Sequence, residues 1–484
     1  MGILRGIVLL CALLGASAGM TQEYFYKKYT ASTFDSGNGI VQLPDLSYVV
    51  TGSSGGFDEY SSQTILMKVD KDGNQVWTKS YGGAGDDVGV RVMHVENEGF
   101  LIAGYSTSTD DGGFDFVLYK TNEQGDLQWE KKYGGSNWEI LHDAQLMQDG
   151  GVILVGQTEG PTTNGADIFM VRTDALGDTL WTKTISTPEA DVAYAVDTLS
   201  ATEILIGGKL GNNGVSTGML AKFNIDGTEE WMSFYDSHGT SIIRDFYVYE
   251  QNIYAVGGII LAQNEKYKCV FKFDFNGLEV GYWAGSQMAS SMFNTVVVRD
   301  ANSLFMGYYA DAEDLNPYPY GNDAFVLKFY TSMYYNDYSG TFSARGDDIL
   351  NEIILTADGG IAIVGTSSDS DRLGIDNYLG TDLMIVKIGP NDETIMVPDT
   401  GNDLVALSEE TISNFSIYPN PTKNKINIPE EIHGFSYDLV DFKGAVMKSG
   451  ILSEKIDIST FDAGVYFLRV KGENTVWNAK IIKE

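Results

Sequence analysis

Cysteine and proline are scarce in this 484-residue chain, and helical patterning is absent. The sequence holds two cysteines, Cys11 and Cys269, and 10 prolines against 55 glycines. Because Cys11 lies in an N-terminal segment that we expect to be removed, the mature chain keeps one cysteine and no internal disulfide can form. Apolar residues do not recur at helical spacing, whereas glycine, tyrosine and phenylalanine are abundant, which favours tight turns between aromatic-rich strands. The composition therefore predicts an all-β fold.

Basic residues are also scarce. The chain has 32 Lys and Arg against 66 Asp and Glu, a formal charge of −34. This excess disfavours nucleic acid and anionic membrane surfaces as partners. Carboxylates are ligands of calcium, so calcium is the one cofactor that the composition allows. Beyond the N-terminus no apolar run approaches the roughly 20 residues that a membrane-spanning helix needs, so we expect no transmembrane segment in the mature chain.

The N-terminus has the features of a signal peptide, which we place at residues 1–18. Arg5 is basic, Ile7–Leu14 is a short apolar run, and Ala16-Ser17-Ala18 is a small-residue cleavage signal. Cys11 raises the alternative of a lipoprotein, but Leu10 precedes it where a small residue is expected. The segment therefore predicts export rather than lipid anchoring.

Residues 19–391 repeat seven times, as two independent markers show. Each repeat has a short apolar strand that ends in glycine and a following strand that carries a basic residue. The glycines are Gly52, Gly104, Gly156, Gly207, Gly257, Gly307 and Gly365, and the basic residues are Lys68, Lys120, Arg172, Lys222, Lys272, Lys328 and Lys387. A period near 50 residues is typical of a propeller blade or a solenoid repeat.

Each repeat is predicted to form four strands, named A to D. In the second repeat they are residues 89–95, 100–104, 114–120 and 127–133. The turn between C and D reads Asp/Asn-x-x-Gly in five repeats, where the acid or amide caps the turn and glycine takes the positive φ. Strand D carries Trp-x-Lys-x-Tyr, whose alternate residues share one face and would pack on the next blade.

The seventh repeat lacks its strand D, because the chain runs from Lys387 into Gly389-Pro390. The missing pattern is at the other end of the protein, where Phe25-Tyr-Lys27-Lys-Tyr29 has Phe in place of Trp. An N-terminal strand that completes the last blade pairs open sheet edges, which a solenoid has no reason to do. We therefore predict a seven-bladed β-propeller closed by its N-terminal strand.

The last 71 residues, 414–484, follow a linker at 392–413. They contain an ordered series of short motifs, Asn414–Pro421, Lys425–Ile428, Tyr437–Gly444, Glu454–Ile458, Gly464–Val470 and Lys480–Lys483. They resemble the type A C-terminal sorting domain of the bacterial type IX secretion system, and the preceding repeats resemble propeller repeats of surface proteins that carry this domain. The resemblance implies a small β-sandwich that an outer-membrane translocon recognises, and a secreted or outer-surface location. It assigns the sorting signal to Tyr418, Pro419, Asn420, Pro421, Gly464, Tyr466, Lys480 and Lys483.

Catalytic motifs are weak. Gly52-Ser-Ser54-Gly-Gly56 fits G-x-S-x-G, but no helix follows it. The turn from Asp70 begins like a calcium loop but lacks the closing glutamate. The hairpin also resembles quinoprotein propeller repeats, with the Asp-Gly-Trp spacing one residue short and no vicinal cysteines. The four histidines lack the spacing of metal ligands, so we assign no metal site and no catalytic residue.

The strongest binding candidate is the face on which the B–C and D–A connections lie, because B–C loops vary and are longest at residues 309–322 and 367–381. Its candidate residues are Asp311, Asp314, Tyr318, Tyr320, Asp369, Asp371, Asp376 and Tyr378. They suit a glycan, a surface protein or a calcium-assisted contact. We expect a non-catalytic binding or interaction module; the alternative is an extracellular polysaccharide-degrading hydrolase, which convergent buried carboxylates in the central channel would favour.

Overall fold

The structure is a computed structural model, and it divides into two compact units, Met1–Asp399 and Thr400–Glu484. It describes residues 24–390 except 33, 56–60, 109–112, 160–164, 213–214, 236–239, 261–265, 288–291, 312–321, 331–334, 343–347 and 371–377. It also describes residues 413–483 except 415–421, 429–432, 442–445, 462 and 472–475. The predicted signal peptide and most of the predicted linker lie outside the described residues.

The described part of the first unit consists of strands and turns, which confirms the all-β prediction. The strands of the first half are β1 Phe25–Tyr29, β2 Phe34–Gln42, β3 Tyr48–Gly55, β4 Ser62–Val69, β5 Gln75–Tyr81, β6 Asp87–Val95, β7 Gly99–Ser106, β8 Asp115–Thr121, β9 Leu127–Tyr133, β10 Trp138–Leu146, β11 Val152–Glu159, β12 Asp167–Thr173 and β13 Thr179–Ile185. The second half continues with β14 Val192–Ser200, β15 Glu203–Asn212, β16 Val215–Asn224, β17 Glu229–Tyr235, β18 Thr240–Tyr249, β19 Asn252–Ile260, β20 Lys266–Asp274, β21 Glu279–Gln287, β22 Phe293–Asp300, β23 Ser303–Asp311, β24 Asn322–Tyr330, β25 Tyr335–Phe342, β26 Asp348–Leu355, β27 Ile361–Ser370 and β28 Tyr378–Ile388.

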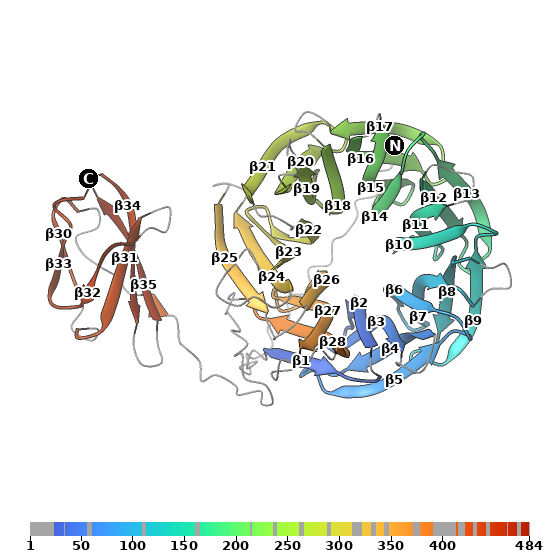
Figure 1. The fold of residues 1–484 in the computed structure, drawn as a ribbon, viewed down its shortest axis with the longest axis horizontal. Coiled ribbons are helices and arrows are strands. Elements are labelled where there is room, and N and C mark those ends of the chain that lie inside the picture. Colours follow the sequence, from blue (N-terminus) through green and yellow to red (C-terminus); the bar gives the residue numbers. More distant parts are fainter. Residues whose placement is uncertain are drawn as a thin grey trace, which may run out of the picture. The chain divides into compact units, whose positions relative to one another are not determined.

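These strands form antiparallel meanders. Five four-stranded sheets run β6–β9, β10–β13, β14–β17, β18–β21 and β22–β25. An eight-stranded sheet joins β26–β28 to β2–β5 through a single parallel pair, Phe34 with Thr381, and carries β1 on β28. Figure 1 shows the sheets standing around a common centre, as in a β-propeller, with β2, β6, β10, β14, β18, β22 and β26 at the inside.

The hydrophobic cores lie between consecutive sheets. One cluster, for example, joins Ile153 of β11 to Ile206 of β15. Another joins Val50 and Ile65, in β3 and β4, to Val364 and Ile385 in β27 and β28, and it includes Phe25 of β1. Apolar side chains on both faces of each sheet are thus removed from water by the neighbouring sheets, which explains why the B and C strands are apolar on both faces.

The outer strands pack on the C–D turn of the following sheet through the Trp-x-Lys-x-Tyr pattern. A Cβ atom placed on Gly125 would lie 2.9 Å from the ring of Trp77. The turn glycine therefore supplies space for the indole as well as its positive φ of 77°. The hydroxyl of Tyr81 donates to the carbonyl of Gly125 at 2.6 Å, and Tyr133 does the same to Gly177 at 2.7 Å.

Strand β1 makes the same contacts with the first sheet. It pairs antiparallel with β28 from Phe25 opposite Lys387 to Tyr29 opposite Leu383. The ring of Phe25 lies over Gly73, where a Cβ atom would be 2.8 Å away, and the Tyr29 hydroxyl donates to the Gly73 carbonyl at 2.6 Å. Lys27 donates to the side chain of Asn74 at 2.7 Å.

Each inner strand contains a β-bulge at the same point, which the sequence had not indicated. The register shifts fall at Gly37/Gly39, Gly89/Arg91, Leu141/Asp143, Ala193/Ala195, Ile243/Asp245, Phe293/Thr295 and Leu350/Glu352. These registers also correct two of the marker glycines. Gly156 lies opposite the last residue before the bulge of its inner strand. In the fourth repeat this position is occupied by Gly208 rather than Gly207, and in the sixth repeat by Tyr308.

The second unit contains the short strands β29 Ser413–Asn414, β30 Lys425–Asn427, β31 Ser436–Asp441, β32 Val446–Ile451, β33 Lys455–Asp457, β34 Gly464–Lys471 and β35 Val476–Lys483. They form a five-stranded sheet, β29-β35-β34-β31-β32, and a two-stranded sheet, β30-β33. Its core brings Ile426 and Ile456 of the small sheet together with Leu439 and Leu468 of the large one. Two sheets with the core between them make a small β-sandwich.

Candidate functional site

The structure places three of the eight predicted loop-face residues, and it places them in strand backbone. Asp311 ends β23 opposite Asn322, Asp369 lies in β27, and Tyr378 begins β28 opposite Ser370. Strands β23, β27 and β28 therefore extend a few residues into the predicted loops, to Asp311, to Ser370 and from Tyr378. Asp314, Tyr318, Tyr320, Asp371 and Asp376 lie outside the described residues.

Buried acids shape the D–A connections on that face. Asp87, with none of its surface exposed, accepts the backbone N–H of Gly83 at 2.8 Å. Asp191 accepts the N–H of Gly211 at 2.8 Å and the Thr187 hydroxyl at 2.8 Å. Asp35 and Glu139 likewise accept the backbone N–H of the residue four positions earlier in the chain. These four acids are spaced by 52 residues, a signal in the sequence that our reading missed.

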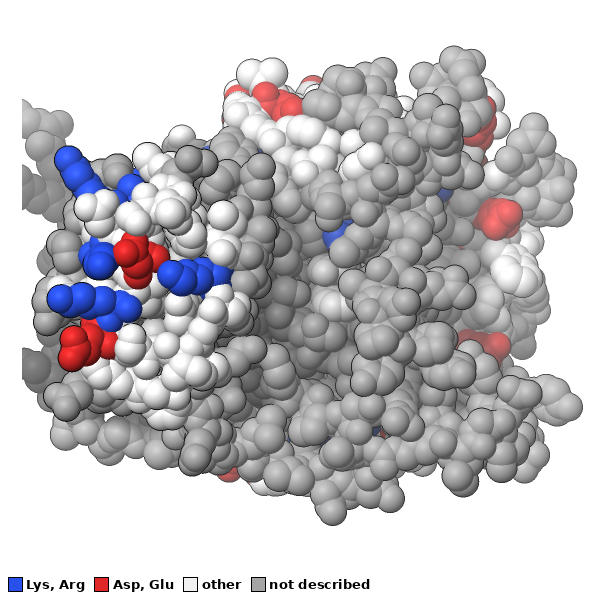
Figure 2. Space-filling model, turned by 60° about the vertical axis from the view of Figure 1, so that its left-hand side comes forward, with Lys and Arg blue, Asp and Glu red and all other residues white. Residues whose placement is uncertain are grey.

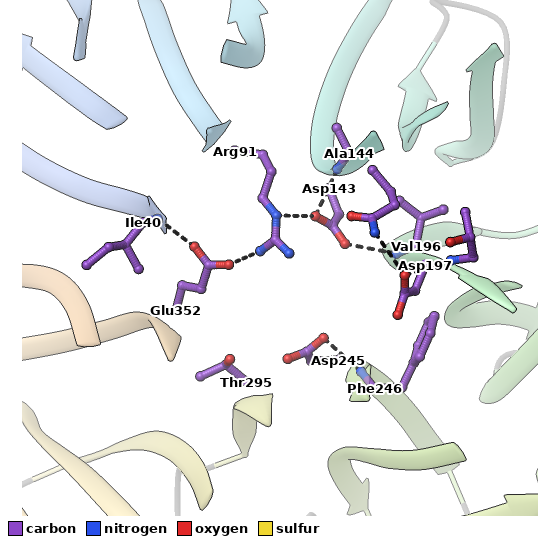
Figure 3. A network of polar contacts seen from close by, with 12 residues as sticks. Ile40, Arg91, Asp143, Ala144, Val196, Asp197, Asp245, Phe246, Thr295 and Glu352 are labelled. Atoms are coloured by element: carbon purple, nitrogen blue, oxygen red, sulfur yellow. Dashed lines mark hydrogen bonds and ion pairs between the residues drawn. The ribbon is translucent and has the colours of Figure 1, made fainter. Parts of the chain in front are cut away.

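A second set of residues, most of them polar, lies on the inner strands directly after the bulges. The residues at this position, one per repeat, are Gly39, Arg91, Asp143, Ala195, Asp245, Thr295 and Glu352. Figure 3 shows Arg91, Asp143, Asp245 and Glu352 pointing toward one another from different strands, with Asp197 beside them. This is the convergence of buried carboxylates that sequence reasoning named as the mark of a hydrolase but could not assign to residues.

Most of these side chains hold the next sheet in place. Glu352 Oε2 accepts the backbone N–H of Ile40 at 2.7 Å. Asp143 Oδ2 accepts that of Val196 at 2.9 Å, and Asp245 Oδ2 that of Val296 at 2.8 Å. The Thr295 hydroxyl accepts the N–H of Ile353 at 3.4 Å. In each case the acceptor lies on one inner strand and the donor on the next inner strand. The bonds of Asp143, Asp245 and Thr295 connect consecutive sheets, and that of Glu352 connects the two halves of the eight-stranded sheet. A carboxylate that accepts backbone N–H groups is a strong, charge-assisted contact.

Arg91 is the cation at the centre of the carboxylates. Its guanidinium pairs with Glu352 through Nη1 and with Asp143 through Nε at 3.5 Å. Burial acts to lower the pKa of Arg91, but the carboxylates of Glu352, Asp143, Asp245 and Asp197 outweigh it and the pKa is raised. Arg91 therefore stays charged.

Burial raises the pKa of the acids. It raises the pKa of Asp143, Asp197 and Glu352 above the ordinary range, and that of Asp245 to about 7, against the opposing effects of the Arg91 charge and of backbone N–H donors. Among the described residues, no group of three or more His, Cys, Asp or Glu has the arrangement of a metal site. Burial therefore favours the protonated form of these acids.

The calcium-like turn from Asp70 is occupied by its own backbone. Asp70 Oδ1 accepts the N–H groups of Asp72 at 3.0 Å and Asn74 at 2.7 Å, and Oδ2 accepts the Asn74 amide at 3.0 Å. The same oxygen positions serve as turn caps at Asn122 and Asp174. The acid is explained by turn geometry.

In the second unit, the predicted sorting residues Gly464, Lys480 and Lys483 lie in paired strands. Gly464 is opposite Lys483, and Lys480 is opposite Phe467. Tyr466 is buried in the core and contacts the ring of Phe461, with 5.4 Å between the ring centroids. Tyr418, Pro419, Asn420 and Pro421 lie outside the described residues. The unit is held by its own core, as a segment recognised separately would need to be.

The charge of the sorting segment differs from that of the rest of the chain. Residues 414–484 hold nine basic and nine acidic residues, so the excess of 34 negative charges lies entirely before residue 414. Figure 2, with the side of the second unit turned forward, shows basic and acidic side chains interspersed on the described surface there. One such contact is Lys425 with Asp457 at 3.4 Å. The two units therefore present different electrostatic surfaces.

The chain is thus an exported protein with a β-propeller unit and a sorting unit. Residues 416–484 match the family of the secretion system C-terminal sorting domain. This segment is a type IX sorting domain, as its motifs predicted, and it directs the protein to the outside of the cell or its surface. The described part of the chain holds no apolar helix of membrane-spanning length. No curated protein matches the chain.

Many solved structures share the propeller architecture. An ulvan lyase of polysaccharide lyase family PL25 is 11% identical with a TM-score of 0.47, covering 75% of this chain and 96% of its own. The β-propeller domain of the Trilobed protease from Pyrococcus furiosus is 8% identical with a TM-score of 0.43, covering 76% and 95%. The Pan2 WD40 domain from Neurospora crassa is 12% identical with a TM-score of 0.41, covering 75% and 99%. At these identities and scores no property of these proteins transfers to this chain.

Proposed function

We propose that the first unit is a seven-bladed propeller whose seventh blade consists of β26, β27, β28 and β1. The five-residue pairing of β1 with β28 supports this, as do the contacts of Phe25 and Tyr29 with Gly73. The hydrogen bond from Ile40 to Glu352 adds a link between the innermost strands of the seventh and first blades. Removing residues 21–30 should then expose a sheet edge and lower the melting temperature or cause aggregation. An unchanged melting temperature would contradict closure by β1.

We also propose that residues 1–18 are a cleaved signal peptide and that 392–413 form a linker. The short apolar run and the Ala16-Ser17-Ala18 signal support cleavage. Mass spectrometry of the exported protein should find a new N-terminus at Gly19. An intact Met1 in the exported protein would contradict this assignment.

For the propeller we propose a non-catalytic binding or interaction role at the cell surface or in the medium. The observation that carries this is the use of the channel carboxylates. Both oxygens of Asp245 accept backbone N–H groups, from Phe246 at 2.7 Å and Val296 at 2.8 Å, and Glu352 is divided between Ile40 and Arg91. Acids that connect sheets in this way are explained by the fold. The variable loop face then becomes the surface for a glycan or surface-protein ligand.

A glycan array with the purified full chain tests this role. We expect selective retention of one glycan class. The variant with Asp369, Asp371 and Asp376 changed to Asn should lose it, while its melting temperature changes little because Asn has the size and shape of Asp. Retention unchanged in the variant would remove these acids from the site. Calorimetric titration with calcium, with and without the three substitutions, tests a calcium-assisted contact: no heat from the unsubstituted chain would contradict it.

One observation favours a second candidate, a polysaccharide-degrading hydrolase. Asp245 has a pKa raised to about 7 by burial and faces other buried carboxyls, which suits a general acid. If this candidate holds, the full chain releases reducing sugar from a panel of polysaccharides. Asp245→Asn would then abolish release while leaving glycan retention intact. A complete absence of release across acidic and neutral substrates would leave the binding role.

A further inference from the structure

A layer of basic and aromatic side chains lies next to the acidic layer of the channel. His142, Tyr194 and Arg244 are the residues immediately before Asp143, Ala195 and Asp245 on three consecutive inner strands, β10, β14 and β18. They occupy the bulges themselves, where two residues of one strand oppose a single residue of the next. A bulge redirects a side chain that regular pleating would point away. The three residues thereby come together from three different sheets.

Tyr194 contacts the other two side chains. The His142 ring lies 5.1 Å from the ring of Tyr194, centroid to centroid. The guanidinium carbon of Arg244 lies 4.3 Å from the centroid of Tyr194, close enough for a cation–π contact. His142 Nε2 is 3.2 Å from the side-chain oxygen of Gln157. Tyr194 is thus in contact with both a histidine and an arginine.

Arg244 differs from Arg91 because it has no anionic partner. It makes no hydrogen bond or ion pair with any described residue, and its Nε atom is buried without an acceptor. The neighbouring acid Asp245 directs both oxygens to backbone N–H groups instead. An arginine left unpaired at a partly buried position is unfavourable, and an anion in contact with its guanidinium would offset that cost.

A second cation lies close to Arg244. Lys209 of β15 occupies the same strand position in its sheet as Gln157 does in β11, beside the inner strand that carries Tyr194. Burial lowers the pKa of Lys209, and the charge of Arg244 lowers it further. The one acid that acts on Lys209, Asp191, is already bonded to Thr187 and Gly211. Arg244 and Lys209 are therefore two positive charges that repel each other, although the chain has about twice as many acidic as basic residues.

We propose that Arg244 and Lys209, with Tyr194 as a platform, form a binding site for an oxyanion in the central channel, and that its ligand is a carboxylate or sulfate group. The guanidinium lies over the tyrosine ring and presents its two terminal nitrogens to a bidentate oxyanion. Lys209 adds a point charge. The inference deepens the binding role proposed above by naming the chemistry of the ligand, a charged group that a free ion or an acidic sugar could supply.

Calorimetric titration of the full chain with sodium sulfate and with sodium glucuronate tests the site, with sodium chloride at the same ionic strength as the reference and methyl glucoside as the neutral analogue. We expect saturable binding of an oxyanion and none of methyl glucoside. Arg244→Gln should raise Kd about tenfold or more, since it removes a charge-assisted contact. Lys209→Gln should raise it less. Lys71→Gln is the control, because Lys71 lies in the turn between β4 and β5 and not on or beside an inner strand. This substitution should leave Kd unchanged.

The outcomes separate the ligand sources and the two proposals. Tighter binding of glucuronate than of sulfate assigns the site to an acidic sugar, and the reverse assigns it to a free oxyanion. No saturable heat from either anion, or the same Kd for Arg244→Gln and the unsubstituted chain, overturns the site. If circular dichroism shows that Arg244→Gln is unfolded, Lys209→Gln decides by the same criterion. Glycan retention at the loop acids does not depend on this result, so the binding role can stand when the oxyanion site fails.

Discussion

A glycine near the end of the second strand lies opposite the bulge in six of the seven inner strands, and Tyr308 takes its place opposite the bulge of β22. At Gly52, Gly104, Gly156, Gly208, Gly257 and Gly365 an added Cβ atom would lie between 1.8 and 2.2 Å from a backbone carbonyl oxygen of the bulged strand. No such contact can be relieved by moving a flexible side chain. The repeated glycine that reveals the period in the sequence is therefore the residue that makes the channel-lining bulges sterically feasible.

Gly156→Ala tests this requirement. The methyl group would meet the carbonyl oxygen of Ile140 at 2.1 Å, so a backbone must shift. We expect a loss of about 1–3 kcal/mol in the free energy of unfolding, as for other overpacked positions. Gly135→Ala is the control, because nothing lies within 4 Å of its Cβ position. Chemical denaturation of the two variants measures the difference, and equal stabilities would remove the steric explanation.

Asp245 should make stability depend on pH. Its carboxyl has a pKa raised to about 7 in the folded state, whereas an unfolded Asp titrates near about 3.9. Between these values the folded state holds a proton that the unfolded state has lost, so stability from this group is greatest below about pH 4 and falls as pH rises to about 7. Asp245→Asn should flatten that decline. Denaturation at pH 5 and pH 8 measures it, and an identical slope in both proteins would contradict a raised pKa.

At the scale of the element, the outer strands share one set of contacts with the turn of the next sheet. Tyr29 of β1 and Tyr81 of β5 each donate to a turn carbonyl at 2.6 Å, those of Gly73 and Gly125. If β1 serves as an outer strand of the ring, the two hydroxyls are equivalent. The element that comes first in the chain would then have the same role as the fourth strand of each repeat.

The matched variants Tyr29→Phe and Tyr81→Phe test that equivalence. Each deletes one hydrogen bond and keeps the ring, so each should lower the free energy of unfolding by about 1 kcal/mol. Equal losses are expected. A loss for Tyr81→Phe with none for Tyr29→Phe would show that β1 is not held against the first sheet.

The sequence predicted elements far better than it predicted the channel. Strand D, its tryptophan and the turn glycine of repeats one to four follow from local pattern and recur with their spacing, so they could be read directly. The second repeat was placed within two residues at each strand end. The bulges could not be read, because a bulge depends on which residues of two strands face each other. Arg91, Asp143, Asp245 and Glu352 were therefore invisible as a group, although each occupies the same place in its repeat.

The regular spacing of Asp35, Asp87, Glu139 and Asp191 was accessible to sequence reasoning and was missed. Acids are so numerous in this chain, at 66, that four of them at a regular spacing do not stand out. The predicted loop acids were chosen for loop length and position, and the structure describes the backbone of only part of that set. Long-range contacts and side-chain direction, which decide a binding site, have no local signature.

At the scale of the molecule, a sorting segment without net charge, residues 414–484, follows a chain that carries all the net negative charge in its first 413 residues. Deleting residues 414–484 should leave the protein in the periplasm, because the sorting domain is the segment that the secretion machinery recognises. Cell fractionation measures the location. Residues 414–484 fused to a fluorescent passenger with a signal peptide should reach the surface or medium. Export of the truncated chain would contradict the role of the segment.

The pairing of β1 with β28 joins residues about 360 positions apart, from Phe25 to Lys387. Contacts so distant in sequence form slowly, because the entropy of closing the loop is lost before the contact contributes. Meanders within single sheets require only neighbouring residues and can form first. We therefore expect β1 to pair with β28 late in folding. Until it does, the edge of β28 is unpaired and can bind strands of other molecules. Where many newly exported chains are close together, slow pairing of β1 with β28 would favour aggregation.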